Sequence, residues 1–245
     1  MGGMKIALIT GGNRGIGRSA AEHLATDGVG VILTYNAHAE EAEAVAAAID
    51  GVALQLDVTD IGDFPDRLRE ALRTNWDRET FDFLVNNGGF SRGGIVADVT
   101  ERDVDDLFAV HFKGPLFLTQ ALLPLIADGG SIVNLSSGLA RFTSPQRAAY
   151  GSIKAAVEML TRYMAVELGP RDINVNVIAP GAVATDFSGG MLRDNPDFQE
   201  HIATLTALGR HAVADDIGPA IANLLRDGNH WITGQRIEVS GGLHL

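Results

Sequence analysis

Short, continuous runs of apolar residues recur along the chain and alternate with longer segments of helical periodicity. Each run has the length of a strand, and an apolar run without polar alternation is typical of a parallel strand covered on both faces. The runs lie near residues 4–10, 29–35, 52–56, 81–86, 130–136, 172–178 and 234–239. This order predicts an α/β fold with a doubly wound parallel sheet of about seven strands and helices on both faces.

The longest segments of helical period cover residues 100–126 and 147–168. Apolar residues of the second segment spread around more than one face, which is more than packing on a sheet requires. They include Ala149, Ile153, Ala156, Val157, Leu160, Met164 and Val166. We interpret this excess as a subunit interface; the alternative is a helix that the C-terminal segment merely covers.

Composition indicates one domain covering residues 1–245. With 46% apolar and 20% charged residues, a chain of 245 residues can bury one sizeable core. No linker, internal repeat or low-complexity run divides it, and the alanine-rich residues 37–48 predict a helix rather than a tether.

Charge and residue types exclude several classes of function. The net charge of −12 disfavours general binding to nucleic acid or anionic membranes. No signal-like segment and no run of 18 apolar residues is present, so we expect a cytoplasmic protein. The chain has no cysteine, and its seven histidines lack ligand spacing, so we expect no metal site.

A glycine-rich turn follows the first apolar run. Residues 4–10 lead into Gly11-Gly-Asn-Arg-Gly-Ile-Gly17, after which a helical period begins. Glycines at these positions allow a tight turn, close approach to a pyrophosphate and packing of the helix on the sheet. Such a turn also occurs at ordinary sharp connections, and its spacing differs from G-x-G-x-x-G, so other motifs must support a dinucleotide site.

Tyr150 and Lys154 are one helical turn apart, and Ser137 ends the apolar run that precedes them. The spacing places phenol and ammonium on one helix face. A phenol with a pKa of about 10 exchanges its proton poorly at neutral pH, and a nearby ammonium should lower that pKa. The three residues form a candidate site for protonating a carbonyl oxygen; the alternative is an ordinary helix-surface pair.

Taken together, the motifs resemble those of the short-chain dehydrogenase/reductase family. They occur in the family's order and span nearly the whole chain, which makes the joint match far more specific than any single motif. They are Thr10-Gly-x-x-x-Gly-Ile-Gly17, Asn86-Asn-Gly-Gly89, Ser137, Tyr150-x-x-x-Lys154, Pro180-Gly181, Ile232-Thr-Gly-Gln and Val239-Ser-Gly-Gly242. The resemblance implies a single-domain Rossmann fold and a hydride-transferring oxidoreductase with Ser137, Tyr150 and Lys154 as catalytic residues.

The resemblance also implies the cofactor contacts. The glycine loop should face the phosphates, two strand ends the adenosine, and the loop after residue 180 the nicotinamide. The residues are Gly11, Asn13, Arg14, Gly15, Ile16, Gly17, Tyr35, Asn36, Asp57, Val58, Asn87, Gly88, Gly89, Tyr150, Lys154, Pro180, Gly181, Val183 and Thr185. Asp57 also suits a turn or helix cap, and family members usually carry Ala in place of Gly88.

The second apolar run favours NADP(H) over NAD(H). An NAD site places an acidic residue about 20 positions beyond the glycine loop, where it binds the ribose 2′-hydroxyl. Here the run ends Thr34-Tyr35-Asn36, and the next carboxylate is Glu40. No acid is therefore present to repel a 2′-phosphate, and Arg14 in the glycine loop supplies a matching cation. The alternative interpretation of Arg14 is a solvated loop residue.

His111 departs from the family pattern. The family carries an Asn in an Asn-x-x-Gly segment, which helps to hold a water between the Lys and solvent, whereas this chain reads His111-Phe-Lys-Gly114. Imidazole also donates and accepts hydrogen bonds, but it is bulkier and titrates near neutrality. Two interpretations stay open: His111 belongs to an altered proton relay, or it only packs in its helix.

Residues 186–211 should form a lid over the substrate. The cleft beneath is expected to be apolar. Its candidate lining is Phe90, Phe142, Phe187, Met191 and Leu192, and three arginines near its mouth could hold an anionic substrate or be ordinary surface residues: Arg92, Arg141 and Arg147.

We therefore expect an NADP(H)-dependent carbonyl reductase or alcohol dehydrogenase that acts on small molecules as a homodimer or homotetramer. One alternative is a 3-oxoacyl-[acyl-carrier-protein] reductase, although Asp128 and Gly129 replace basic residues and the net charge of −12 would repel an acidic partner. A second is a non-catalytic nucleotide-binding regulator. An epimerase or dehydratase would need a larger substrate domain.

Overall fold

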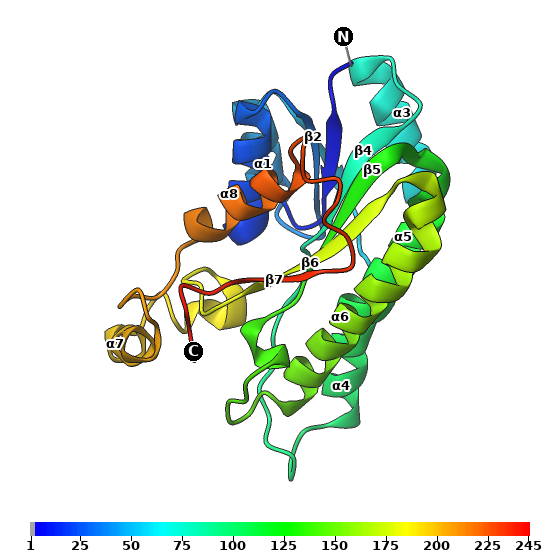
Figure 1. Cartoon of the computed structure of the whole chain (residues 1–245). Coiled ribbons are helices and arrows are strands. Elements are labelled where there is room, and N and C mark those ends of the chain that lie inside the picture. Colours follow the sequence, from blue (N-terminus) through cyan, green and yellow to red (C-terminus); the bar gives the residue numbers. More distant parts are fainter. Residues whose placement is uncertain (1–2) are drawn as a thin grey trace.

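A seven-stranded parallel sheet runs through the computed structural model, which describes residues 3–245; residues 1 and 2 of the predicted domain lie outside the described part. The strand order is β3-β2-β1-β4-β5-β6-β7 (Figure 1). The strands are β1 Ile6–Ile9, β2 Gly30–Tyr35, β3 Val52–Gln55, β4 Phe81–Asn86, β5 Ile126–Leu135, β6 Asn174–Pro180 and β7 Arg236–Val239. The predicted doubly wound sheet is thus confirmed.

Side chains of each strand alternate between two apolar layers. In β1, Ile6 and Leu8 join one core cluster, whereas Ala7 and Ile9 join the other. Successive side chains of a strand point to opposite faces, so a strand covered on both sides is apolar at most positions. This explains the uninterrupted apolar runs of the sequence.

Helices cover both faces of the sheet. On one face, α1 (Gly15–Thr26) and α8 (Ala214–Leu225) lie side by side against β1 and β4 (Figure 1). The other face carries α3 (Phe64–Trp76), α5 (Gly114–Leu122) and α6 (Ala148–Leu168). α2 (Ala39–Ala48) packs on Leu33 of β2.

The predicted segment 100–126 is helical but not one continuous α-helix. It contains α4 (Glu101–Phe108), a π-helical turn η1 (Ala109–Lys113), α5, and a 3-10 turn η2 (Leu123–Leu125). Pro115 has no N–H to donate to the His111 carbonyl, as an α-helix would require, and the chain widens here. A π turn often marks a functional position, and this one contains His111.

The strand predicted at 130–136 begins earlier than expected. β5 starts at Ile126, which already pairs with Phe81 of β4. The register then shifts before Ser131 pairs with Phe83, and Asp128 and Gly129 lie in this irregular stretch. Composition alone makes this stretch resemble a turn. The predicted helix at 147–168 is confirmed as α6.

The predicted lid segment contains a short 3-10 turn, η5 (Phe187–Gly190), and α7 (Pro196–Leu205). The C-terminal residues bond to its far end: Ala207 N–H donates to the Gly242 carbonyl at 3.2 Å, and His244 N–H to the Leu205 carbonyl at 3.1 Å. No helix within residues 3–245 is long and apolar enough to span a membrane.

Candidate functional site

Tyr150 and Lys154 lie buried together on α6, beside the carboxyl end of β5. Ser137 follows that strand in an extended conformation, and its hydroxyl lies close enough to the Tyr150 phenol to lower the pKa of that phenol. Loops at the carboxyl ends of parallel strands form the ligand sites of open α/β sheets. The fold thus brings the three predicted catalytic side chains to one place.

Burial raises the pKa of Tyr150, and the Arg147 charge and the Ser137 hydrogen bond oppose this rise. The sequence predicted instead a pKa lowered by Lys154. That direction is wrong for this structure, because desolvation of the phenolate outweighs the nearby charges. At neutral pH the phenol holds its proton and can donate it.

The Lys154 ammonium is anchored beside the Tyr150 ring. Its Nζ donates to the Leu135 carbonyl at 2.7 Å and lies 5.7 Å from the ring centroid of Tyr150. Burial lowers the pKa of Lys154 to about 7. Lys154 therefore exchanges protons near neutrality, unlike an exposed lysine.

His111 reaches the same site from η1. Its Nε2 lies 2.6 Å from the Phe90 carbonyl, and its ring meets the Tyr150 ring edge-on at 5.4 Å between centroids. A carbonyl only accepts, so Nε2 carries the proton and donates. Burial and the charge of Lys154 lower the pKa of His111, so the ring is neutral and Nδ1 is a bare acceptor.

Nδ1 of His111 has no hydrogen-bond partner among residues 3–245, although it is buried. Buried polar atoms are normally satisfied by protein or by ordered water. A Cβ added to Gly89 would lie 2.3 Å from Cε1 and 2.9 Å from Nδ1 of His111. Because residue 89 is a glycine, there is room for the imidazole of His111, which is larger than the Asn side chain of the family.

A network behind Ser137 was missed at the sequence level. The neighbouring Ser136 is buried, and its hydroxyl donates to Glu158 of α6 at 2.7 Å. Glu158 also accepts from Nε of Arg236 in β7 at 2.7 Å. This network joins the end of β5 to α6 and β7, and no sequence spacing indicates it.

The glycine loop fits a dinucleotide. Gly11 and Gly15 have left-handed φ values of 62° and 54°, and a Cβ on Gly17 would lie 2.3 Å from the Gly11 carbonyl oxygen. The helix α1 starts at Gly15, and its first turn, Gly15-Ile-Gly-Arg18, carries no carboxylate. Its free amides and positive dipole end suit a pyrophosphate.

The predicted contacts at Asn87 and Gly88 adjoin this loop. Thr10 Oγ1 accepts from the backbone N–H groups of Asn87 and Gly88 at 3.0 and 2.9 Å. The Asn87 side chain donates to the Thr10 and Gly11 carbonyls at 2.9 and 3.1 Å. These bonds fix the glycine loop to the end of β4.

The loop after β6 lies next to the glycine loop. Pro180 ends β6, and a Cβ on Gly181 would lie 3.0 Å from Cα of Ser240. Val183 pairs with Ala212 across a short bridge. A Cβ on Gly15 would lie 3.4 Å from the methyl group of Thr185, so the two predicted cofactor loops are neighbours.

The predicted adenosine contacts lie at the ends of β2 and β3. Asn36 donates to Asp57 at 3.4 Å, while Asp57 Oδ1 accepts from the Thr59 N–H at 2.9 Å. Asp57 thus also serves as the turn residue that its sequence allowed. Val58 packs on Gly114, where an added Cβ would lie 3.1 Å from its methyl group.

Arg14 is exposed at the N-cap of α1, next to Ile16 in the first turn. The adjacent Asn13 is buried and donates from Nδ2 to Glu41 Oε2 at 2.8 Å. Glu41 was not predicted, because it comes from the first turn of α2 rather than from the strand end. It places a carboxylate at the glycine loop.

The predicted cleft residues separate into two groups. Phe187 lies 6.0 Å from Tyr150 and Phe90 5.8 Å from His111, between ring centroids, so both adjoin the site. The Phe142 ring lies tilted against His244, with 4.5 Å between ring centroids, and a Cβ on Gly138 would lie 2.5 Å from the Phe142 ring, while Leu192 is buried. Met191 is exposed on the lid segment.

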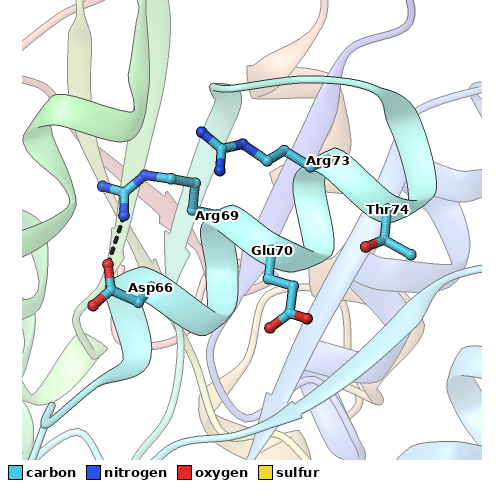
Figure 2. Close-up of a pocket in the computed structure, with 5 residues that line it drawn as sticks. All are labelled: Asp66, Arg69, Glu70, Arg73 and Thr74. Atoms are coloured by element: carbon cyan, nitrogen blue, oxygen red, sulfur yellow. Dashed lines mark hydrogen bonds and ion pairs between the residues drawn. The ribbon is translucent and has the colours of Figure 1, made fainter.

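The linings of two surface hollows include neither Tyr150 nor Lys154. One, of about 420 Å³, lies on α3, where Asp66 and Arg69 pair at 2.6 Å beside Glu70, Arg73 and Thr74 (Figure 2). All five residues project from one helix to the surface, and none was a predicted site residue. The other, of about 470 Å³, is lined by Gly93, Gly94, Ile95, Asp98, Val99, Asp103 and Gln146.

Comparisons with known proteins agree with this arrangement. A family model described as enoyl-(acyl carrier protein) reductase, of the short-chain dehydrogenase/reductase family, matches residues 11–244. The chain is 35% identical to the 3-oxoacyl-[acyl-carrier-protein] reductase FabG of Staphylococcus aureus, over 98% of each protein.

Two solved structures illustrate the similarity in fold. The promiscuous reductase LugOII, which catalyses keto-reduction in lugdunomycin biosynthesis, has a TM-score of 0.91 and 35% identity, over 98% of this chain and 97% of that one. The angucycline C-6 ketoreductase LanV with bound NADP has a TM-score of 0.88 and 35% identity, over 98% and 95%. The chain belongs to the short-chain dehydrogenase/reductase family of oxidoreductases.

Proposed function

We propose that the protein is an NADP(H)-dependent oxidoreductase that interconverts a carbonyl and a secondary alcohol, with Tyr150 as the general acid and base. One observation carries the proposal: Tyr150, Lys154 and Ser137 converge beside the paired cofactor loops, and the buried Tyr150 holds its proton at neutral pH. The bound cofactor supplies or accepts the hydride at the substrate carbon.

The protein's own groups handle the proton. In reduction, the Tyr150 phenol gives its proton to the substrate oxygen, to which Ser137 donates a hydrogen bond. Lys154 favours the resulting phenolate and holds the nicotinamide ribose. Its pKa of about 7 suits it to return a proton to Tyr150 near neutrality.

We propose that His111 is a positioning residue in this proton route. Its bare Nδ1 can accept a hydrogen bond from a water, and the charge of Lys154 reaches the ring. Such a water would connect the Lys154 ammonium to solvent, as the water held by the family's Asn does. The alternative, a purely packing role, leaves the buried Nδ1 without a partner.

The cofactor preference rests on the surroundings of the 2′-position. Arg14 is an exposed cation at the glycine loop, and Tyr35 and Asn36 end β2 without a carboxylate. The ketoreductase LanV, at 35% identity, binds NADP. Glu41 opposes this preference, but its carboxylate is engaged by Asn13.

We propose residues 186–211 as the substrate lid of a single catalytic domain, and an exposed apolar face on α4, α5 and α6 as a subunit interface. These helices lie together at one side of the molecule (Figure 1). The exposed apolar residues there are Val104, Phe108, Phe117, Met159, Tyr163 and Val166. Their number favours a homodimer or homotetramer over a monomer.

A 3-oxoacyl-[acyl-carrier-protein] reductase is the second candidate, favoured by the 35% identity to FabG. The charge pattern opposes it. Asp128 occupies the stretch where basic residues would meet an acidic carrier, and it holds Arg171 in an ion pair at 2.7 Å. The net charge of −12 adds repulsion.

A screen of NADPH oxidation over ketones, aldehydes and 3-oxoacyl thioesters tests the proposal. Wild-type enzyme should reduce at least one small carbonyl compound, and Tyr150→Phe should lose turnover by about 10²–10⁴-fold while retaining NADPH affinity. Near-native activity of Tyr150→Phe would refute the assignment. Tight NADPH binding without turnover of any compound would favour a non-catalytic regulator.

A further inference from the structure

Arg147 is a half-buried cation at the start of α6, and it makes no ion pair with a carboxylate of residues 3–245. The other two arginines predicted at the cleft mouth are neutralised. Arg92 pairs with Asp103 at 3.2 Å, and Arg141 pairs with Glu238 at 3.0 Å. Arg147 alone of the three keeps its charge available.

The guanidinium is held in place but not saturated. Nη1 of Arg147 donates to the Ser91 hydroxyl at 2.8 Å. Its backbone bridges to Gly94, whose N–H donates to the Gln146 carbonyl at 3.0 Å, and its own carbonyl accepts from the Gly151 N–H at 2.8 Å. A guanidinium has five N–H donors, so most stay available to a ligand.

Arg147 also lies near the catalytic tyrosine. It precedes Tyr150 by three residues, a spacing that places two side chains on neighbouring positions with Cβ atoms about 5–6 Å apart. Its positive charge acts on the Tyr150 phenol, which shows that the two groups interact electrostatically. Phe90, which precedes Ser91, and Phe187, beside Tyr150, supply apolar surface nearby.

We propose that Arg147 binds a carboxylate of the substrate, so that the preferred substrates are oxo acids and the corresponding hydroxy acids. Their carboxylate lies one or two carbons from the reacting carbonyl, because Arg147 is the N-cap residue of α6 and Tyr150 follows three residues later. The planar fork of a guanidinium matches the two oxygens of a carboxylate. This assignment rests on the proposed function, whose substrate class it specifies.

The test uses matched pairs of compounds, each an oxo acid and its methyl ester, including phenylglyoxylate with methyl phenylglyoxylate. Arg147→Met removes the charge and keeps an apolar stem of similar length. Arg73→Met is the control, because Arg73 is an exposed residue of α3 that lies outside the proposed site and the proposed interface. Both variants change the net charge equally.

Wild-type enzyme should prefer the acid of at least one pair. Arg147→Met should reduce kcat/KM for that acid by about 10–100-fold, mainly through KM, since hydrogen bonds to charged groups contribute about 1.5–3 kcal/mol. Activity on the ester should change by less than about 3-fold, and Arg73→Met should match wild type. Equal losses for acid and ester would overturn the proposal.

Binding provides a readout independent of turnover. In the Tyr150→Phe background with NADPH, calorimetry should show the acid binding about 10–100-fold more tightly when Arg147 is present. A wild-type protein that neither reduces nor binds any acid of the panel better than its ester would overturn the assignment. If no carbonyl compound is reduced but the acid still binds through Arg147, the proposed function fails and the anion site stands.

Discussion

Nε2 of His111 donates a hydrogen bond to the backbone carbonyl of Phe90 at 2.6 Å. The bond selects one tautomer of a neutral imidazole and leaves Nδ1 as an acceptor in a buried position. It also joins the π-helical turn η1 to the chain segment that follows β4. His111 therefore keeps a hydrogen-bonding role at the position where the family carries Asn.

The imidazole of His111 and the missing side chain of Gly89 should be energetically coupled. Gly89→Ala should lower the free energy of unfolding by about 2–3 kcal/mol, because the new Cβ would lie 2.3 Å from Cε1 of His111. Adding the smaller side chain of His111→Asn should recover at least about 1 kcal/mol of this loss. Urea unfolding of the single and double variants measures the coupling.

Gly88→Ala is the control for that cycle. Its Cβ would lie 3.3 Å from Thr10 Oγ1, so a slight adjustment suffices and the loss should stay below about 1 kcal/mol. Equal destabilisation by Gly88→Ala and Gly89→Ala, or additive effects in the double variant, would contradict the prediction.

The proton route predicts a difference between two His111 variants. His111→Asn should keep turnover within about 3-fold of wild type, because a side-chain amide also offers a donor and an acceptor. His111→Leu should lower kcat by about 10-fold or more with KM little changed, because it removes both groups. Steady-state kinetics across pH 6–9 compares the two variants. Equal activity of both would show that His111 has only a packing role and no part in the proton route.

Burial of Lys154 should make stability rise with pH. Its pKa is about 7 in the folded protein, well below that of an exposed lysine. Between about pH 7 and 10 the unfolded chain binds a proton that the folded protein lacks, so raising the pH stabilises the fold by up to about 1.4 kcal/mol per unit. Tyr150, whose pKa is raised, reverses the trend only above about pH 10.

This trend is measured as a difference. The free energy of unfolding of wild type minus that of Lys154→Met should rise from pH 7.5 to 9.5, while the same difference with Lys113→Met, an exposed lysine, should stay constant. A constant difference for Lys154→Met would mean that the buried amine is charged throughout this range.

Cofactor preference should depend on opposing charges at the glycine loop. Arg14→Ala should weaken NADPH binding by about 10–100-fold with little effect on NADH, because only NADPH carries the 2′-phosphate. Glu41→Gln should strengthen NADPH binding, since it removes a carboxylate while keeping an oxygen that can accept from Asn13. Fluorescence titration measures both cofactors, and equal changes for NADPH and NADH would count against the preference.

The exposed apolar face of α6 should control assembly. Val166 is 78% exposed, and Val166→Glu should shift the protein towards smaller species in light scattering at micromolar concentration, because a buried unpaired charge is costly. Val96, 82% exposed in a loop, gives the control Val96→Glu, which should leave the mass unchanged. A wild-type protein that is monomeric in this measurement would contradict the proposed interface.

Local patterns were sufficient for the sheet and for the central site residues. Each buried strand is a short apolar run, because parallel strands are covered on both faces, and the order of runs and helices leaves few topologies. The Tyr150–Lys154 spacing fixes a helix face, and the glycines at 11, 15 and 17 report a backbone turn that tolerates no side chain. Two predicted element boundaries were wrong for local reasons. β5 begins at Ile126 because a glycine-containing stretch still pairs, and the segment 100–126 is interrupted by a π-helical turn near Pro115.

The sequence by itself determined the order of the strands, the family motifs and the identity of the chemical groups at Ser137, Tyr150 and Lys154. Only the tertiary structure decided their electrostatic state and their neighbours. Burial raises the pKa of Tyr150 and lowers that of Lys154, and Glu41, which no motif indicates, meets the glycine loop through Asn13. The physical reason is that desolvation and Coulomb interactions depend on distances through space, which residue spacing along the chain does not encode.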